Sequence, residues 1–179
     1  SMPKLDYKWD SNRVHCVLIE SNQELEIKRI VNFIKTIGIT NMDIGLIKVL
    51  FNGGFKTIKD ILTISRENLL LLDRIENKMA IKIRNSIDNI IKNPISISKI
   101  MDGSLCFGNG FGEKRCRQLV IKYPDFLTNT PSIDALQMLN GWSDKSINKF
   151  INGLDGFKQF LDENAFLNLL YPENSTVHS

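Results

Sequence analysis

The chain has few cysteines and no long uninterrupted apolar run. Cys16, Cys106 and Cys116 form no C-x-x-C pair, and their odd number argues against a disulfide framework. Charged residues interrupt each apolar stretch before it could span a bilayer, and the N-terminus lacks the basic and apolar segments of a secretory signal. These absences predict an intracellular protein from a reducing compartment, with no membrane partner.

The charge of the chain is small in total but unevenly distributed. The 179 residues have a net charge of +3, with nine basic and three acidic residues between Lys78 and Lys122. From Leu154 onward, four residues are acidic and one is basic. A basic face that meets a polyanion and an ordinary solvated face both fit this distribution. Ser1-Met2 resembles a cloning remnant, so we expect a fragment of a longer protein.

Apolar residues recur at helical spacing over nearly the whole chain, which predicts an all-α fold. Only residues 14–19 have the pattern of a strand, so the fold has a short β-like N-terminal lead-in. Ser65 is a predicted N-cap. Helices are expected at residues 25–37, 44–51, 58–62, 67–72, 79–91, 95–101, 113–121, 132–139, 143–151 and 163–170.

Four short turns with an apolar central residue repeat along this helical pattern. They start at Asn41, Arg74, Gly110 and Gly141, so the intervals are 33, 36 and 31 residues. Each turn opens an amphipathic helix, and each has a lysine in or near that helix, namely Lys48, Lys78, Lys114 and Lys145. Nearly constant spacing predicts a tandem array of about four helical hairpins.

The third turn, Gly110-Phe111-Gly112, has the most informative sequence. Glycines allow the backbone to approach a bulky partner, and the N–H groups at the start of the next helix favour an anion. With Lys114 beside them, they form the signature of a helix-hairpin-helix turn, which suits a DNA phosphate. The fourth turn keeps one glycine and the first two have none. We therefore expect the third turn above all to bind DNA, and some of the others to be chiefly structural.

Four segments together resemble the helix-hairpin-helix domain of NAD-dependent DNA ligases. They are residues 32–43, the leucine-rich residues 69–78, residues 94–114 and residues 139–161, and the similarity covers about residues 23–165. Its sharpest part is 101–114, with Met101-Asp102-Gly103-Ser104 and the third turn. Bacterial members of the family place a four-cysteine zinc site before the hairpins. This chain has Trp9, Asn12, His15 and Cys16 there, which cannot build such a site. The zinc-free variant suggested by ligases of large DNA viruses is the better comparison.

The resemblance implies sequence-independent binding of duplex DNA near a nick, during replication or repair. Residues 1–22 would be a lead-in, 23–170 the DNA-binding domain and 171–179 a flexible tail. The parent enzyme would use NAD and magnesium in adjacent ligase domains, whereas this fragment would contain no catalytic residue, metal or cofactor. The residues expected at DNA are Asn41, Lys78, Asn109, Gly110, Gly112, Lys114, Arg115, Arg117, Gly141, Ser143 and Lys145.

The nucleotidyl-transfer motif is missing from the chain. That chemistry needs a nucleophilic lysine in a Lys-x-Asp-Gly pattern, and Lys99-Ile100-Met101-Asp102-Gly103 has one residue too many. We therefore expect that this fragment does not seal nicks by itself.

Several residues and functions keep two interpretations. Phe111 and Trp142 are plugs in the hairpin core or wedges into DNA, and Lys82 and Arg84 are solvated residues or DNA contacts. His15-Cys16 is a packing pair or half of a metal site, whereas Cys116 fits buried packing. The alternative functions are a hairpin array of a nuclease or polymerase and a helical scaffold that binds protein. The base-flipping pocket of a glycosylase has no counterpart in the sequence.

Overall fold

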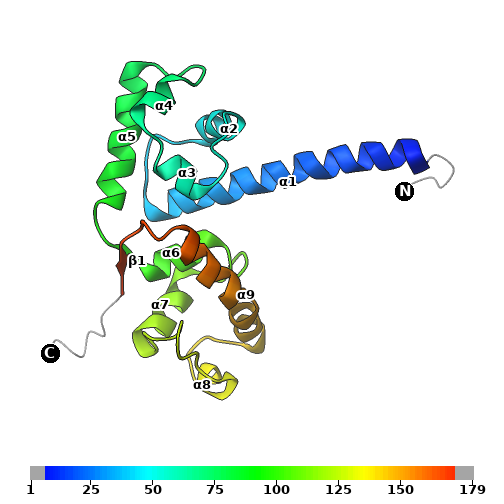
Figure 1. The fold of residues 1–179 in the computed structure, drawn as a ribbon. Helices are drawn as coiled ribbons and strands as arrows, with labels where there is room; N and C mark the ends of the chain where they lie inside the picture. The colour runs from blue at the N-terminus through cyan, green and yellow to red at the C-terminus, as the bar shows by residue number, and fades with distance from the viewer. Residues whose placement is uncertain (1–6, 172–179) are drawn as a thin grey trace.

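The computed structural model describes the backbone of residues 7–171 and the side chains of residues 22–171. The predicted tail at 171–179 lies outside this part except for its first residue. Within it the chain is mostly helical, with one small parallel sheet (Figure 1). The elements are α1 (Tyr7–Ile37), α2 (Ile44–Asn52), α3 (Ile58–Leu62), α4 (Arg66–Leu70), α5 (Asn77–Ile91), β1 (Ile95–Ser96), α6 (Ile97–Ser104), α7 (Glu113–Lys122), α8 (Ile133–Gln137), α9 (Asp144–Glu163) and β2 (Leu169–Leu170).

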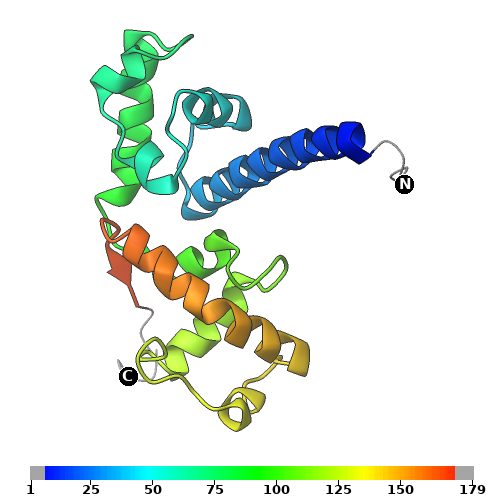
Figure 2. The ribbon, with the colours of Figure 1, turned by 45° about the vertical axis from the view of Figure 1, so that its right-hand side comes forward.

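The predicted strand at residues 14–19 is wrong, because these residues belong to the 31-residue helix α1. A strand needs a neighbour to satisfy its backbone N–H and C=O groups, whereas a helix satisfies them within its own segment. Once the strongly periodic part of α1 has formed a helix, extending that helix by one residue costs little free energy, because each added residue makes a further hydrogen bond. The N-terminal part of α1 extends away from the other helices in both views (Figures 1 and 2).

Two other predicted helices are partly extended. Ile95–Ser96 and Leu169–Leu170 pair as parallel strands, and the backbone N–H of Ile95 donates to the carbonyl of Asn168 over 2.7 Å. Pro94 cannot continue α5, so the chain leaves that helix in an extended conformation. The helix predicted at 95–101 therefore begins at Ile97, and the one predicted at 163–170 is absent.

Helix α1 lies between two groups of helices, α2–α5 on one side and α6–α9 on the other (Figures 1 and 2). A hydrogen bond joins it to the second group, because Asn32 Nδ2 donates to the Gly103 carbonyl over 3.0 Å. The rings of Phe33 and Phe160 meet edge to face, 5.3 Å apart. One apolar core therefore runs through both groups.

Helix α9 continues well beyond the predicted end at residue 151. Gly153 and Gly156 do not break it, although glycine is a poor helix former. Gly153 packs directly against the carbonyl group of Cys106, where a Cβ atom would overlap the backbone. The helix therefore continues because tertiary packing at this glycine outweighs its intrinsic propensity.

Candidate nucleic-acid interface

Each of the four predicted turns joins two helices, and all four begin with the same backbone conformation. We call residues 41–43, 74–76, 110–112 and 141–143 turns 1 to 4. Their first residues have φ angles of +64° at Asn41, +68° at Arg74, +80° at Gly110 and +82° at Gly141. Residues other than glycine and asparagine rarely adopt this left-handed region. All four turns thus begin with a residue in the left-handed region.

The buried positions after each turn repeat as well. The central residues Met42, Ile75, Phe111 and Trp142 are 3–8% exposed, so both aromatic residues are plugs in the core. Six residues after the start of each turn stand Ile47, Ala80, Cys116 and Ile147, and nine residues after it stand Leu50, Ile83, Leu119 and Phe150. All eight of these side chains are at most 2% exposed. The helix after every turn thus packs its face in the same register.

The third residue of each turn caps the next helix, and here the turns differ. Asp43 and Ser143 accept hydrogen bonds from the N–H groups of Leu46 and Ser146, as N-caps do. Glu76 and Gly112 make no such bond, so α5 and α7 begin without a side-chain cap. Only Gly112 has positive φ, +89°, which explains why turn 3 alone needs a second glycine. The predicted DNA residue Ser143 thus also has a structural role.

Exposed cations follow the turns at a fixed distance. Lys78, Lys114 and Lys145 each stand four residues after the start of turns 2, 3 and 4, and all are exposed. Turn 1 has Gly45 at this position, and its nearest following cation is Lys48. Cβ atoms added to Gly110, Gly112 or Gly141 would have no neighbour within 4 Å. The surface of turns 3 and 4 is therefore open to a partner.

Arg115 and Asn109, both predicted to contact DNA, make hydrogen bonds within the protein. Arg115 donates through Nη1 to the carbonyl of Phe111 over 3.0 Å and through Nε to that of Gly141 over 3.4 Å. It therefore ties turn 3 to turn 4, and a phosphate would compete with these carbonyls. Asn109 accepts a bond from Lys149 Nζ through its carbonyl, over 3.2 Å. Arg117 remains mostly exposed, with Glu113 4.0 Å away.

Turns 1 and 2 form a groove that the sequence did not reveal. Its volume is about 810 Å³, and both turns line it. Asn41 spans from turn 1 to α5, because its Nδ2 donates to Ser86 Oγ over 2.9 Å. The charged residues along the groove are Lys35, Arg74, Lys78 and Lys82, with Asp43 and Glu76. Lys82 thus faces this groove, whereas Arg84 is half-buried and donates to the carbonyls of Leu62 and Ile64.

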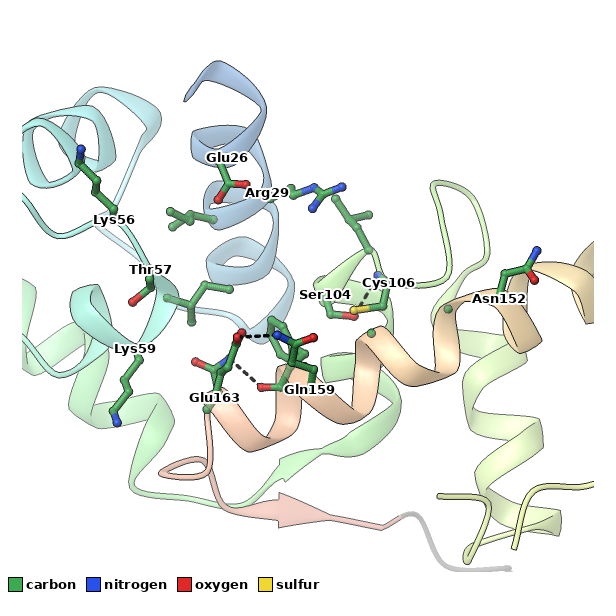
Figure 3. A pocket seen from close by; sticks show the side chains of 17 residues that line it. Glu26, Arg29, Lys56, Thr57, Lys59, Ser104, Cys106, Asn152, Gln159 and Glu163 are labelled. Carbon is green, nitrogen blue, oxygen red and sulfur yellow. Dashed lines mark hydrogen bonds between the residues drawn. The ribbon is translucent and has the colours of Figure 1, made fainter. Parts of the chain in front are cut away.

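A second cavity, of about 820 Å³, lies between α1, α3, α6 and α9 (Figure 3). Its charged lining residues are the cations Arg29, Lys56 and Lys59 and the carboxylates Glu26 and Glu163. The Cys106 thiol borders this cavity, and burial raises its pKa, so it is protonated at neutral pH. None of the residues predicted to meet DNA lines the cavity.

The segment that comes nearest to the nucleotidyl-transfer pattern, residues 99–103, lies on α6. Lys99 is exposed on α6, while burial, followed by the nearby Glu113 carboxylate, raises the pKa of Asp102. Cys116 is fully buried, and burial raises its pKa strongly, in agreement with a packing role. No cluster of three His, Cys, Asp or Glu that could hold a metal occurs among residues 22–171. His15 and Cys16 lie outside the described side chains.

Comparison with known proteins relates the chain to viral DNA ligases. It is 32% identical over 167 residues to the DNA ligase of Acanthamoeba polyphaga mimivirus, which covers 89% of this chain and 26% of the ligase. It is 31% identical over 140 residues to the protein of Invertebrate iridescent virus 6 named "Putative DNA ligase 205R", which covers 78% of this chain and 22% of that protein. The chain is therefore a distant homologue of viral DNA ligases over most of its length.

The chain spans about a quarter of the length of these curated relatives. No protein-family model matches it, and no solved structure matches it significantly. Within residues 7–171, no helix combines the length and apolar character needed to cross a bilayer.

Proposed function

We propose that this chain is a tandem helix-hairpin-helix module that binds duplex DNA for an NAD-dependent DNA ligase. Its role is to hold nicked DNA while the remaining ligase domains, with NAD and magnesium, join the strands. The observation that carries this proposal is the exposed lysine that recurs four residues after the start of turns 2, 3 and 4. Its place in three repeats of one backbone conformation, in a homologue of DNA ligases, favours a regularly spaced polyanion.

The geometry suits phosphates rather than base edges. The first N–H groups of each helix point along its axis and have no acceptor within the helix. At α5 and α7 no side-chain cap occupies them. A phosphate at turn 2 or turn 3 would accept these N–H groups and pair with Lys78 or Lys114. Such contacts are the same for every sequence, so the module would position the duplex without a base code.

Turn 2 therefore joins turn 3 as a proposed phosphate site, although it has no glycine. Glu76 weakens the local field there, but Arg74, Lys78 and Lys82 outnumber it along the groove. Turns 1 and 4 have their first helical N–H groups partly satisfied by Asp43 and Ser143. We rank turns 2 and 3 above turns 1 and 4 as phosphate contacts.

The test is fluorescence anisotropy with nicked duplex, intact duplex and single strand over a series of salt concentrations. Each neutralised phosphate adds roughly −0.9 to the slope of log affinity against log salt. Lys78→Ala/Lys114→Ala/Lys145→Ala should bind duplex weakly and reduce the slope by roughly 2.7, three times that value. A matched control, Lys28→Ala/Lys92→Ala/Lys99→Ala, removes the same charge from exposed sites away from the turns.

If both triple variants lost the same affinity for duplex DNA, specific contacts at the turns would be rejected. Binding would then depend only on the net charge of the protein. Salt-independent binding, or no duplex binding at low salt, would favour the helical protein scaffold instead. Binding that is no tighter to nicked than to intact duplex would favour a hairpin array of another DNA-processing enzyme.

A further inference from the structure

Turns 2 and 4 each follow a large apolar side chain that points into solvent. Leu71 is 82% exposed and Met138 is 77% exposed, more than any other large apolar side chain among residues 22–171. Each stands three residues before the first residue of its turn, because Leu71 precedes Arg74 and Met138 precedes Gly141. Single exposed apolar residues are common on protein surfaces. Here the same exposure occurs twice at one position of a repeat.

The two positions have the same local structure. The backbone angles are φ −77° and ψ −13° at Leu71, and φ −78° and ψ −12° at Met138. Each residue ends a five-residue helix capped by a serine, Ser65 or Ser132, 67 positions apart in the sequence. Both backbone N–H groups donate to the carbonyl three residues earlier, over 3.2 Å. The backbone therefore directs both side chains outward in the same way.

The surroundings of Leu71 point to a partner that is both apolar and anionic. Leu71 borders a groove of about 600 Å³ between α2 and turn 2, and Lys48 and Arg74 line the same groove. Asp73 is the one carboxylate there, so cations prevail. Met138 likewise precedes a turn that Arg115 contacts and that Lys145 follows. Sugar faces between two rows of phosphates in the DNA minor groove have this combination of apolar and anionic surface.

We infer that Leu71 and Met138 are paired apolar contacts to the minor groove of duplex DNA, an inference that rests on the proposed function. While the cations hold phosphates, the two side chains pack on sugars and base edges between them. Proteins that bind the minor groove use Leu and Met in this way, and the inserted side chains bend the duplex. Because turns 2 and 4 belong to different halves of the fold, the two contacts would be made at separate steps of the duplex.

The decisive variant is Leu71→Ser/Met138→Ser, measured by anisotropy on nicked duplex over the same salt series. We expect about a tenfold loss of affinity, because the variant buries less apolar surface when it binds DNA. The salt slope should not change, since no phosphate contact is lost. The control Leu25→Ser/Ile133→Ser changes the next most exposed large apolar residues, at 56% and 54% exposure, and should keep the wild-type affinity. The swap Leu71→Met/Met138→Leu should also keep it.

The outcomes separate this inference from the proposed function. If wild type binds duplex and the serine variant binds equally well, the two side chains do not touch DNA and the inference is wrong. A reduced salt slope in the serine variant also overturns it, because the substitutions would then act through the phosphate contacts. If wild type itself fails to bind any duplex, the proposed function fails first and this inference fails with it.

Discussion

The first pair of turns, 1 and 2, and the second pair, 3 and 4, begin with the same left-handed φ but with different residues. The second pair has glycine as the first residue of both turns, whereas the first pair has Asn41 and Arg74 there. For an L-residue this conformation costs about 1–2 kcal/mol, and asparagine tolerates it best. The backbone of the first pair is therefore strained at Arg74. The same residue lines the groove between turns 1 and 2.

The cores below the two pairs differ as well. The second pair is centred on aromatic rings: Phe111 meets Trp142 edge to face at 5.3 Å, and Phe107 stacks on Phe150 at 5.5 Å. Beneath the first pair, the plugs are Met42 and Ile75. Aromatic pairs add about 0.5–1.5 kcal/mol beyond the area that they bury. We infer that stability is concentrated in the second pair.

The largest expected effect is the loss of the aromatic plug. Phe111→Ala should lower the free energy of unfolding by about 3–5 kcal/mol, because it leaves a cavity beside Trp142 and Phe107. The matched change Met42→Ala should cost about 2 kcal/mol, since Met42 borders an open groove that can adjust around it. Urea unfolding followed by circular dichroism measures both. Equal losses would contradict the proposed difference between the pairs.

A medium effect on stability is expected at Gly53 and Gly153, which stand twelve residues after the first residues of turns 1 and 4. Gly153→Ala should destabilise the protein by about 3 kcal/mol, because the new methyl group would overlap the backbone of Cys106. Gly53→Ala meets the end of the Leu72 side chain, which can rotate away, so about 1 kcal/mol is expected. Thermal unfolding of the two variants should preserve this order. A milder effect at Gly153 would show that α9 can shift away from Cys106.

The smallest expected effect separates stability from binding at the left-handed positions. Arg74→Gly should raise the free energy of unfolding by about 1 kcal/mol, because it relieves the backbone strain. Gly141→Ala should lower it by about the same amount, although its Cβ would meet no neighbour. Chemical denaturation measures both changes. Under the proposed function, Arg74→Gly should also weaken duplex binding, so a variant that gains stability and keeps full affinity would remove Arg74 from the DNA contacts.

The positions of the four turns could be predicted from the sequence because the features that mark them are local. The left-handed starts of the turns fall on the four predicted positions, and the central residues are buried as plugs. The helix boundaries at α2 and α3 and the cap at Ser65 were also found, since apolar spacing and capping residues act within one or two turns of helix. The strand at 14–19 failed because a short β-branched run does not show whether a pairing partner exists.

The candidate site could be predicted only in part from the sequence. The sequence singled out Lys78, Lys114 and Lys145 beside the turns, and the structure places them at equivalent exposed positions. It did not show that Arg115 bonds carbonyls of two turns, that Arg84 is used within the protein, or that turns 1 and 2 share a groove. Contact of the predicted residues with DNA stays a prediction.

The sequence by itself determined where the four turns lie, which residue plugs each one and which helices follow. These features depend on spacing and on the backbone preferences of a few neighbouring residues. Tertiary structure alone decided that α1 lies between the two pairs, that β1 finds β2 late in the chain, and that α9 continues through Gly153. Each of these depends on surfaces from distant segments, and their complementarity cannot be read from either segment alone.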